Sequence, residues 1–396
     1  IGQSESGKST LQKQFQILYA PQTLESERAA WRGIIYVNVI ATVRQIFEVV
    51  EPTQNDRDYV LHGRFTEDDR GKWEGPSRFT PSPAGEPSAH VDLLTLRYRL
   101  SPLMSVESTL AERLGAGFHV DGETGSQEMF VRRGWQQLRP RGTGSEAKAR
   151  RKRGIPEGRP SLEIDEQLYE ASRLIEACKD DIHLLWNHPT VQRLMMKGRI
   201  VVKESSDFFM NEIDRISSLD FVPTNDDILY ARIRTVGIAE YTYQLQFGAK
   251  MRTWRIVDVG GTRRQRHAWI PYFDNATAII FLCPVSAFDQ WLDEDPTTNR
   301  IEDSMKLFSI VCSSPLLKRT HIVLFLNKID ILKEKLKNGA KVRKSIPTYG
   351  NRENDVDTVV KYFQSHFQTV FRKSNPPSES GHQGQGRQVR HAGWSR

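Results

Sequence analysis

A glycine-rich, phosphate-binding type of loop stands at the start of the chain. The segment Gly2-Gln3-Ser4-Glu5-Ser6-Gly7-Lys8-Ser9-Thr10 fits the pattern G-x-x-x-x-G-K-[ST]. At this spacing the backbone N–H groups can surround a phosphate, while Lys8 reaches its terminal oxygens and the Ser9 hydroxyl binds Mg²⁺. The predicted contact residues are Ser4, Glu5, Ser6, Gly7, Lys8, Ser9 and Thr10. For this pattern alone, a Gly/Ser turn that caps a helix is the alternative interpretation.

A second motif indicates which base the nucleotide carries. Asn327-Lys328-Ile329-Asp330 follows a continuous apolar run and fits N-K-x-D. A carboxylate at Asp330 can accept hydrogen bonds from the ring N1–H and exocyclic amine of guanine, an arrangement that adenine does not offer. The Lys328 stem can cover the ring, and Asn327 can tie this loop to the phosphate loop. The pair of motifs therefore predicts GTP or GDP, although the tetrapeptide by itself also fits a simple strand-end turn.

A third group of residues could serve the metal and the third phosphate. In Asp258-Val259-Gly260-Gly261 the carboxylate can reach Mg²⁺ through water, and the Gly261 N–H can meet the γ-phosphate without a Cβ in the way. Thr235 can place a second hydroxyl on Mg²⁺. Arg232, three residues earlier, can neutralise charge in the transition state. Predicted metal ligands are Ser9, Thr235 and Asp258, and the predicted nucleotide contacts include Asp258, Gly260 and Gly261.

Helical and strand periodicity places these motifs at the ends of elements. A helix is expected over Thr10–Leu18, with Leu11, Phe15 and Leu18 on one face, and others over Glu27–Val50, Val106–Leu114, Leu162–Leu185, Ser206–Ile216 and Arg300–Cys312. Strands are expected at Tyr241–Phe247, Trp254–Asp258, Ala278–Leu282 and Ile322–Leu326. Strands that alternate with helices predict a doubly wound α/β sheet, whose ligands bind at the carboxyl ends of strands.

Composition and charge argue against nucleic-acid binding, a cysteine metal site and a membrane span. The 396 residues have a mean hydropathy of -0.54 and a net charge of +7, but the basic residues concentrate in Arg139–Arg153 and Phe371–Arg396. A solvated linker explains the run Lys148–Arg153 better than nucleic-acid binding, so no nucleic-acid partner is expected. Cys178, Cys283 and Cys312 lack metal-ligand spacing and predict buried thiols. No apolar run looks long enough to span a bilayer.

Taken together, these segments resemble a heterotrimeric G-protein α subunit of a diverged fungal type. The resemblance rests on GxxxxGKST, DILYARIRTVGI, DVGGTRRQRHAWIPYFDNATAIIF, NRIEDSMKLF and FLNKID, and covers residues 1–50 and about 160–375. It implies a P-loop Ras-like GTPase domain interrupted by an all-α helical domain. It further implies an arginine finger at Arg232, nucleotide contacts at Ser205, Leu229 and Tyr230, and a GTP-state latch made by Gly261, Arg266 and Asp303.

The resemblance also implies partners and a location. They are a βγ dimer that binds through Arg263–Trp269, a G-protein-coupled receptor, and the cytoplasmic inner face of the plasma membrane; the motifs do not specify an effector.

Two departures from the family pattern affect catalysis. Thr262 stands where the family has the glutamine that orients the attacking water, and Ser4 stands where it usually has glycine. We therefore expect a GTPase with slow hydrolysis in which Arg232 and Thr262 are the catalytic positions.

The expected organisation has four parts. Residues 1–26 and 222–375 form the Ras-like GTPase domain, 27–52 and 160–221 the helical domain, 53–159 a long and largely disordered insertion, and 376–396 an atypical disordered tail. We expect the chain to lack the strand before the phosphate loop, and the last strand, base-backing loop and receptor-binding helix after residue 375. Two alternatives remain: a non-catalytic scaffold or non-functional fragment without stable nucleotide binding, and an ATP-using P-loop enzyme, which Asn327 and Asp330 disfavour.

Overall fold

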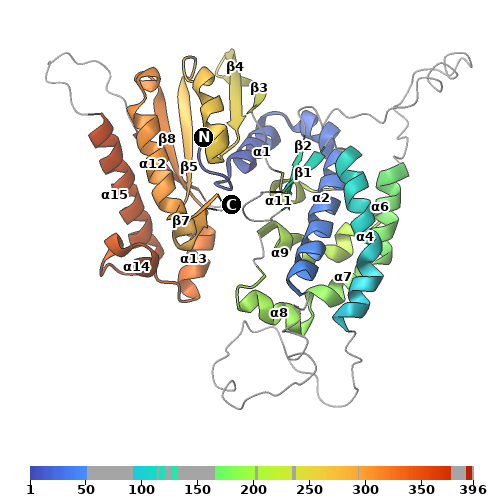
Figure 1. Ribbon diagram of the computed structural model, residues 1–396. Coiled ribbons are helices and arrows are strands. Elements are labelled where there is room, and N and C mark those ends of the chain that lie inside the picture. The colour runs from blue at the N-terminus through green and yellow to red at the C-terminus, as the bar shows by residue number, and fades with distance from the viewer. Residues whose placement is uncertain are drawn as a thin grey trace, which may run out of the picture. The chain divides into compact units, whose positions relative to one another are not determined.

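The computed structural model describes residues 1–50, 92–113, 116–120, 127–131, 166–200, 204–233, 238–292, 294–375 and 389–394. These residues divide into two compact units. The phosphate-loop unit draws on Ile1–Ala30, Leu114–Leu138 and Ile233–Arg396, and the helical unit on Trp31–Arg113 and Arg139–Arg232. Figure 1 shows the elements of each unit.

A parallel sheet forms the centre of the phosphate-loop unit. It has the order β5-β8-β9, from β5 (Ala278–Pro284), β8 (His321–Asn327) and β9 (Val389–Trp394). Ile1 and Gly2 run along the free edge of β5, where Gly2 bridges to Leu282 and the Leu282 N–H donates to the Ile1 carbonyl at 3.0 Å. The phosphate loop therefore starts directly from the sheet.

Three small antiparallel pairs accompany this sheet. They are the hairpin of β3 (Ile238–Phe247) and β4 (Lys250–Val259), the pair β6 (Trp291–Leu292) and β7 (Asp295–Asn299), and the pair β1 (Ala116–Val120) and β2 (Gln127–Val131). The last residues of β4 lead into the Asp258–Gly261 loop, so the hairpin positions the predicted metal and γ-phosphate arm.

Helices cover the apolar strands of this unit. They are α1 (Lys8–Tyr19), α12 (Arg300–Ser313), α13 (Ile329–Lys337), α14 (Val342–Ser345) and α15 (Val356–Ser374), with 3-10 helices η3 (Arg263–Tyr272), η4 (Val285–Asp289), η5 (Pro315–Leu317) and η6 (Pro347–Tyr349). Figure 1 shows α12 and α15 beside β5 and β8. Phe308 lies edge-on to Phe281 of β5 and to Phe367 of α15, with ring centroids 5.0 and 5.1 Å apart. This packing of strand and helix aromatics explains why the strand sequences are continuously apolar.

The helical unit packs around one central helix. Its elements are α2 (Pro21–Val50, which begins in the other unit), α4 (Leu93–Arg113), α6 (Glu166–Ala177), α7 (Lys179–Trp186), α8 (Pro189–Met196), α9 (Glu204–Asn211), α10 (Ile213–Ile216) and α11 (Asn225–Tyr230). By length and hydropathy α2 could cross a membrane, contrary to our expectation for the chain. Ile34, Ile35, Val39 and Ile40 are nevertheless fully buried, as in the core helix of a folded domain.

The expected disordered insertion is wrong over residues 93–113, which form the long helix α4. Leu96, Leu100, Leu103 and Leu110 are buried, and the helix packs against α6 and α7. The sequence suggested only a short helix at Val106–Leu114, because Pro102 and an exposed basic face obscure the period. The remainder of the insertion, apart from β1 and β2, lies outside the described residues.

The expected patternless tail is also wrong in part. Val389–Trp394 forms β9, which pairs in parallel with β8 over Ile322–Asn327. A short strand at the sheet edge needs only backbone hydrogen bonds, so it can form without the apolar run that marks a buried strand. Residues 376–388 lie outside the described residues.

Two further expectations differ from the structure. The helix α1 turns Gln12, Lys13 and Gln16 inward and leaves Leu18 68% exposed. Gln12 donates to the Tyr243 hydroxyl at 3.2 Å and Gln16 to Glu27 at 2.7 Å, so hydrogen bonds rather than apolar contacts hold this face. The boundary of the helical unit lies after Arg232 rather than after residue 221, because α11 packs on α9.

The buried-thiol interpretation is confirmed. Cys178, Cys283 and Cys312 are all free and buried. Burial raises the pKa of the Cys283 thiol to about 12, which keeps it protonated and unreactive.

Candidate functional site

The phosphate loop is a tight turn whose backbone conformation depends on glycine. Gly7 has φ 97°, and a Cβ there would lie 2.3 Å from Asn327 Nδ2. Gly2 has φ 144°, and a Cβ there would lie 2.4 Å from the Leu282 carbonyl oxygen. Glu5 also has a positive φ of 59°. The loop is thus pressed against the ends of β5 and β8, as a phosphate cradle at the carboxyl edge of a sheet must be.

Lys8 is the first residue of α1, and its side chain reaches back to the start of this loop. Its ammonium group donates to the carbonyl of Gly2 at 3.0 Å and to that of Gln3. Burial lowers the pKa of Lys8 to about 8, Asp258 opposes this shift, and the nearby Arg266 and Arg300 add to it. A partly buried cation near two arginines is an environment that an anionic ligand would stabilise.

The predicted metal ligands Ser9 and Asp258 lie together. The Ser9 hydroxyl donates to Asp258 Oδ2 at 2.8 Å, and Asp258 is buried at the end of β4. A hydroxyl and a carboxylate are the oxygen ligands that Mg²⁺ prefers, so this pair fits that ion. The third predicted ligand, Thr235, lies outside the described residues.

The Asp258–Gly261 loop packs directly on the phosphate loop. A Cβ on Gly261 would lie 2.4 Å from the Gln3 carbonyl carbon and 2.4 Å from the Ser4 nitrogen. The Trp269 indole donates to the Gly260 carbonyl at 3.0 Å, which fixes η3 to the same loop. Thr262 is buried at the N-cap of η3, one residue after Gly261, and makes no side-chain cap bond.

The Asn327–Asp330 loop is joined to the phosphate loop. Asn327 Nδ2 donates to the Ser6 carbonyl at 2.8 Å, across 321 residues of sequence. Lys328 has φ 63° and is the N-cap of α13, and Asp330 is exposed in the first turn of that helix. Thr10 lies in the first turn of α1. The two loops that the sequence assigned to phosphate and base are therefore adjacent.

The remaining predicted residues belong to the helical unit. Ser205 is in α9, Leu229 and Tyr230 are in α11, and the Tyr230 ring stacks on Phe208 at 4.0 Å between centroids. Arg232 follows α11, where its N–H donates to Asn38 Oδ1 at 3.0 Å and its carbonyl accepts from Asn38 Nδ2 at 3.2 Å. Asn38 on α2 thus holds the backbone of Arg232, a contact that no sequence pattern indicated.

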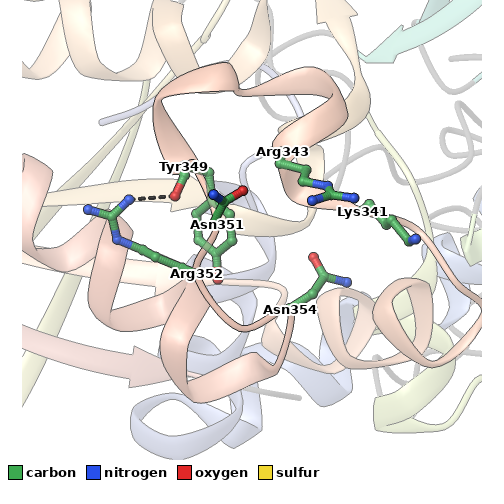
Figure 2. Close-up of a pocket in the computed structure, with 6 residues that line it drawn as sticks. All are labelled: Lys341, Arg343, Tyr349, Asn351, Arg352 and Asn354. Carbon is green, nitrogen blue, oxygen red and sulfur yellow. Dashed lines mark hydrogen bonds between the residues drawn. The ribbon is translucent and has the colours of Figure 1, made fainter.

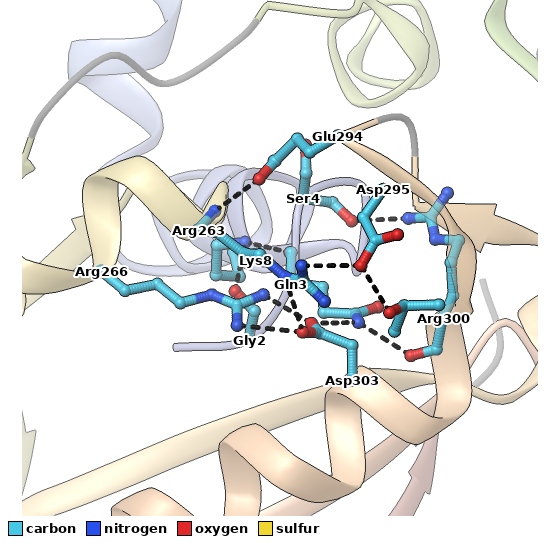
Figure 3. Close-up of polar contacts among 11 residues, drawn as sticks. Gly2, Gln3, Ser4, Lys8, Arg263, Arg266, Glu294, Asp295, Arg300 and Asp303 are labelled. Carbon is cyan, nitrogen blue, oxygen red and sulfur yellow. Dashed lines mark hydrogen bonds and ion pairs between the residues drawn. The ribbon is translucent and has the colours of Figure 1, made fainter.

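An ion-pair cluster joins η3, α12 and the phosphate loop (Figure 3). Arg266 donates to both carboxylate oxygens of Asp303, at 3.2 and 2.5 Å, and Arg263 adds a bond to Asp303 at 3.3 Å. Arg300 and Gln3, which sequence reasoning missed, complete the cluster from α12 and the loop. Gln3 occupies a position that the loop pattern leaves unspecified, so only the fold reveals its contacts.

A cavity of about 400 Å³ lies apart from these loops, near α14 and η6 (Figure 2). It is lined by Lys341, Arg343, Tyr349, Asn351, Arg352 and Asn354. Arg352 donates to the Tyr349 carbonyl and lies 5.1 Å from the centre of the Tyr362 ring. None of the predicted nucleotide contacts lines this cavity.

Comparison with known proteins agrees with the geometry of the loops. The model of the G-protein alpha subunit family matches residues 1–383. The chain is 29% identical to guanine nucleotide-binding protein alpha-4 subunit of Mycosarcoma maydis, over 94% of this chain and 74% of that protein. It is 38% identical to the alpha-3 subunit of Caenorhabditis elegans over 52% of this chain, and 34% identical to the G(o) subunit alpha of Geodia cydonium over 46%.

The chain spans about half the length of the two animal relatives, 57% and 50% respectively. The family model, however, covers nearly all of it, from the phosphate loop through α15. Because that match includes both nucleotide motifs and the helical unit between them, the chain belongs to the G-protein alpha subunit family.

Proposed function

We propose that this chain is a guanine nucleotide-binding switch that binds GTP and GDP at the phosphate loop. The observation that carries the proposal is the contact between the two motif loops. Asn327 donates to the Ser6 carbonyl and its amide nitrogen fills the space where Gly7 lacks a Cβ. A guanine base bound by Asp330 and Lys328 would therefore lie next to the phosphates bound by Ser4–Thr10.

Mg²⁺ is proposed as the cofactor of this site. Ser9 and Asp258 are the described residues that would hold it, with Thr235 as a further hydroxyl. When bound, the ion would supply positive charge that neutralises the phosphates. The chain's own contribution is a pair of oxygen ligands, Ser9, which is next to Lys8 in the sequence, and Asp258, which accepts a hydrogen bond from Ser9. The Lys8 ammonium would pair with the phosphate oxygens.

We propose that hydrolysis is slow in this protein. Thr262 has a short hydroxyl where a glutamine amide would orient the attacking water. Ser4, whose backbone nitrogen packs against Gly261, adds a side chain to the phosphate loop. Arg232 would still neutralise charge in the transition state, since a guanidinium needs no proton transfer to do so. Ser205, Leu229 and Tyr230 are proposed to contact the nucleotide from the helical unit.

The proposed partners are a βγ dimer and a G-protein-coupled receptor at the inner face of the plasma membrane. The names of the relatives describe alpha subunits of guanine nucleotide-binding proteins, which supports a heterotrimeric assembly. On this chain η3 offers exposed basic residues at Arg263, Arg264 and His267, with Ile270 54% exposed beside them. A mixed basic and apolar surface of this kind suits a protein partner.

Binding of a fluorescent GTP analogue, with ATP as competitor, tests the proposal. We expect saturable binding that GTP and GDP displace and ATP does not. Asp330→Ala should abolish the preference for guanine, whereas Glu334→Ala, an exposed acidic residue on the same helix, should leave it unchanged. Absence of binding would favour a scaffold, and equal displacement by ATP would favour an ATP-using enzyme; either result contradicts the proposal.

A further inference from the structure

Asn38 interrupts an apolar stretch of α2. The residues around it read Ile34-Ile35-Tyr36-Val37-Asn38-Val39-Ile40, and each of the other six is at most 1% exposed. Asparagine is a weak helix former, and its amide needs hydrogen-bond partners where water is excluded. A specific set of hydrogen bonds is therefore expected for this side chain.

The side-chain amide of Asn38 bonds in two directions. Its nitrogen donates to the Ile34 carbonyl, one turn back, at 2.8 Å, which orients the amide on its own helix. The same nitrogen donates to the Arg232 carbonyl at 3.2 Å, and the amide oxygen accepts from the Arg232 N–H at 3.0 Å. Both backbone polar groups of Arg232 are therefore bonded to one side chain that lies 194 residues earlier in the sequence.

These bonds begin where helix α11 ends. The Ala231 N–H donates to the Asp227 carbonyl at 2.8 Å, and Ala231 is the C-cap of the helix. Arg232 is the next residue and belongs to no helix or strand. α11 thus fixes the chain as far as Ala231, and Asn38 fixes it at Arg232. Loss of the Asn38 amide would leave the helix intact but release the peptide groups on either side of Arg232.

α2 is a rigid support for this contact. The Thr42 hydroxyl, one turn after Asn38, donates to the Asn38 carbonyl at 2.9 Å and lies 2.9 Å from the Ser206 hydroxyl of α9. Thr42 and Ser206 are both buried. The helix that carries Asn38 is therefore tied to a second helix one turn away from the contact with Arg232. A buried and cross-linked helix can hold a side chain in a single orientation.

We propose that Asn38 is a positioning residue for Arg232, whose backbone it fixes so that the guanidinium can neutralise charge in the transition state. This inference rests on the proposed function. An arginine side chain has several rotatable bonds, so its guanidinium is placed reproducibly only when its backbone is placed. Without Asn38, Arg232 must be ordered during the reaction. Release of the γ-phosphate should then slow, whereas binding of the nucleotide should not change.

Single-turnover release of the γ-phosphate from labelled GTP by the full chain tests this. Asn38→Ala should slow release by about tenfold, the effect expected when about two hydrogen bonds are lost. The Kd of the fluorescent GTP analogue should change by less than about twofold. A lower rate at unchanged affinity indicates an interaction that matters in the transition state rather than in the bound ground state.

A double-mutant cycle with Arg232→Ala separates positioning of the arginine from a general effect on the fold. In the Arg232→Ala protein, Asn38→Ala should change release by less than about twofold, because no guanidinium remains to be positioned.

Asn38→Asp is a second variant, for use if the alanine variant does not fold. It keeps the shape and the acceptor but places a carboxylate oxygen against the Ile34 and Arg232 carbonyls. It should therefore also slow release, and again only while Arg232 is present.

Asn211 provides the matched control in the same unit. Its amide donates to the Asp207 carbonyl, one turn back, at 2.8 Å and accepts from the Trp186 indole N–H at 3.1 Å. It therefore makes the same kind of bonds as Asn38, but it joins α9 to α7. Asn211→Ala should leave both the rate of release and the Kd within about twofold of the unmodified values.

The proposal is overturned if Asn38→Ala and Asn38→Asp release phosphate as fast as the unmodified protein. It is equally overturned if they slow release by the same factor with and without Arg232.

Hydrogen exchange of the Arg232 amide gives a measurement that does not need catalysis. It should be about tenfold faster in Asn38→Ala, while residues 34–40 stay protected. If no nucleotide binds, or if Arg232→Ala leaves release unchanged, the proposed function fails. The exchange of the Arg232 amide then still decides whether Asn38 holds this segment, and unchanged exchange contradicts it.

Discussion

At the scale of residues, the site depends on where side chains are absent. Gly7 and Gly261 leave the space into which Asn327 and the phosphate-loop backbone fit, and a Cβ at either position would lie within 2.4 Å of those atoms. The sequence motifs predict that phosphate binding requires these glycines. The structure adds that they also allow three loops from different parts of the chain to pack together.

Lys8 gives a prediction about pH. Because burial lowers the pKa of Lys8 to about 8, the protein without nucleotide should lose the ammonium above that pH, and nucleotide affinity should fall about tenfold per pH unit beyond it. The free energy of unfolding depends on pH with the opposite sign. The unfolded chain keeps this proton up to the ordinary pKa of 10.5, so the Lys8 contribution to stability rises between pH 8 and 10.5.

The measurement is the Kd of the fluorescent analogue from pH 7 to 9.5. Lys8→Arg is the control, since a guanidinium stays charged over this range. Its affinity should follow only the titration of the nucleotide. Parallel pH profiles for the two proteins would show that Lys8 does not titrate in the site.

Thr262 and Ser4 give a prediction about rate. Thr262→Gln should raise single-turnover γ-phosphate release by about tenfold or more, because the longer amide can orient the attacking water. Ser4→Gly alone should have a smaller effect, and the double variant should exceed the product of the two, since the Ser4 backbone packs on Gly261 and Thr262 is the next residue along the chain, so the two sites are close enough to couple. An unchanged rate in the double variant would mean that another group limits hydrolysis.

At the scale of elements, short helices are held by their caps more than by their length. In α11 the Thr224 hydroxyl accepts from the Asp227 N–H at 3.2 Å and Asp227 accepts from the Thr224 N–H at 2.7 Å. Arg215 of α10 adds two bonds to the same carboxylate, at 2.9 and 2.7 Å. These bonds fix the six-residue helix α11, which precedes Arg232, although an isolated helix of this length is unstable in water.

Replacement of Asp227 tests this arrangement. Asp227→Asn should destabilise the helical unit by about 2 kcal/mol, because a buried charge-assisted network is broken. Burial alone would raise the pKa of Asp227, but the bonds from Arg215 and Thr224 keep it below the ordinary 3.8. The stabilisation is therefore present above pH 3.8 and is lost as the pH falls through the folded-state value, so the variant should lack this acid sensitivity.

Urea denaturation from pH 2.5 to 7 provides the measurement. Asp226→Asn, an exposed residue in the same first turn, is the control and should change the free energy of unfolding by less than about 0.5 kcal/mol. Equal effects of the two substitutions would indicate that the helix dipole, rather than the capping network, is responsible.

At the scale of the whole molecule, the phosphate-loop unit is completed by segments far apart in the chain. Ile1–Gly2 lies along β5, and β9 at residues 389–394 extends the other edge of the sheet through β8. Pairing of this kind involves few local contacts, so it forms only when the rest of the unit is folded. The sheet therefore depends on both sequence ends of the described chain.

Proline substitution in β9 tests the contribution of this strand. Successive N–H groups of a strand point to opposite sides, so His391→Pro combined with Ala392→Pro removes one donor that faces β8. Residues 321–327 should then exchange hydrogen about tenfold faster, while residues 204–216 of the helical unit should not change. The control His391→Ala with Ala392→Ser keeps both N–H groups and should leave β8 protected; an equal loss in the control would assign the effect to side chains.

The local chemistry proposed for this protein can be inferred from short stretches of its sequence. Contiguous motifs such as Gly2–Thr10, Asp258–Gly261 and Asn327–Asp330 indicate a backbone shape and a proposed ligand within a few residues, which is why their interpretation did not require a fold. The apolar runs of β5 and β8 likewise marked the buried strands, because a strand covered on both faces has no polar positions.

Which of these segments meet, and what else they contact, follows from the fold and from no local pattern. α4 was obscured by Pro102, β9 by the lack of an apolar period, and the inward face of α1 by its glutamines. Gln3 and Asp303, 300 residues apart, follow no spacing rule at all. Such contacts arise from packing of distant segments, where burial and hydrogen bonding act between residues that no local period relates.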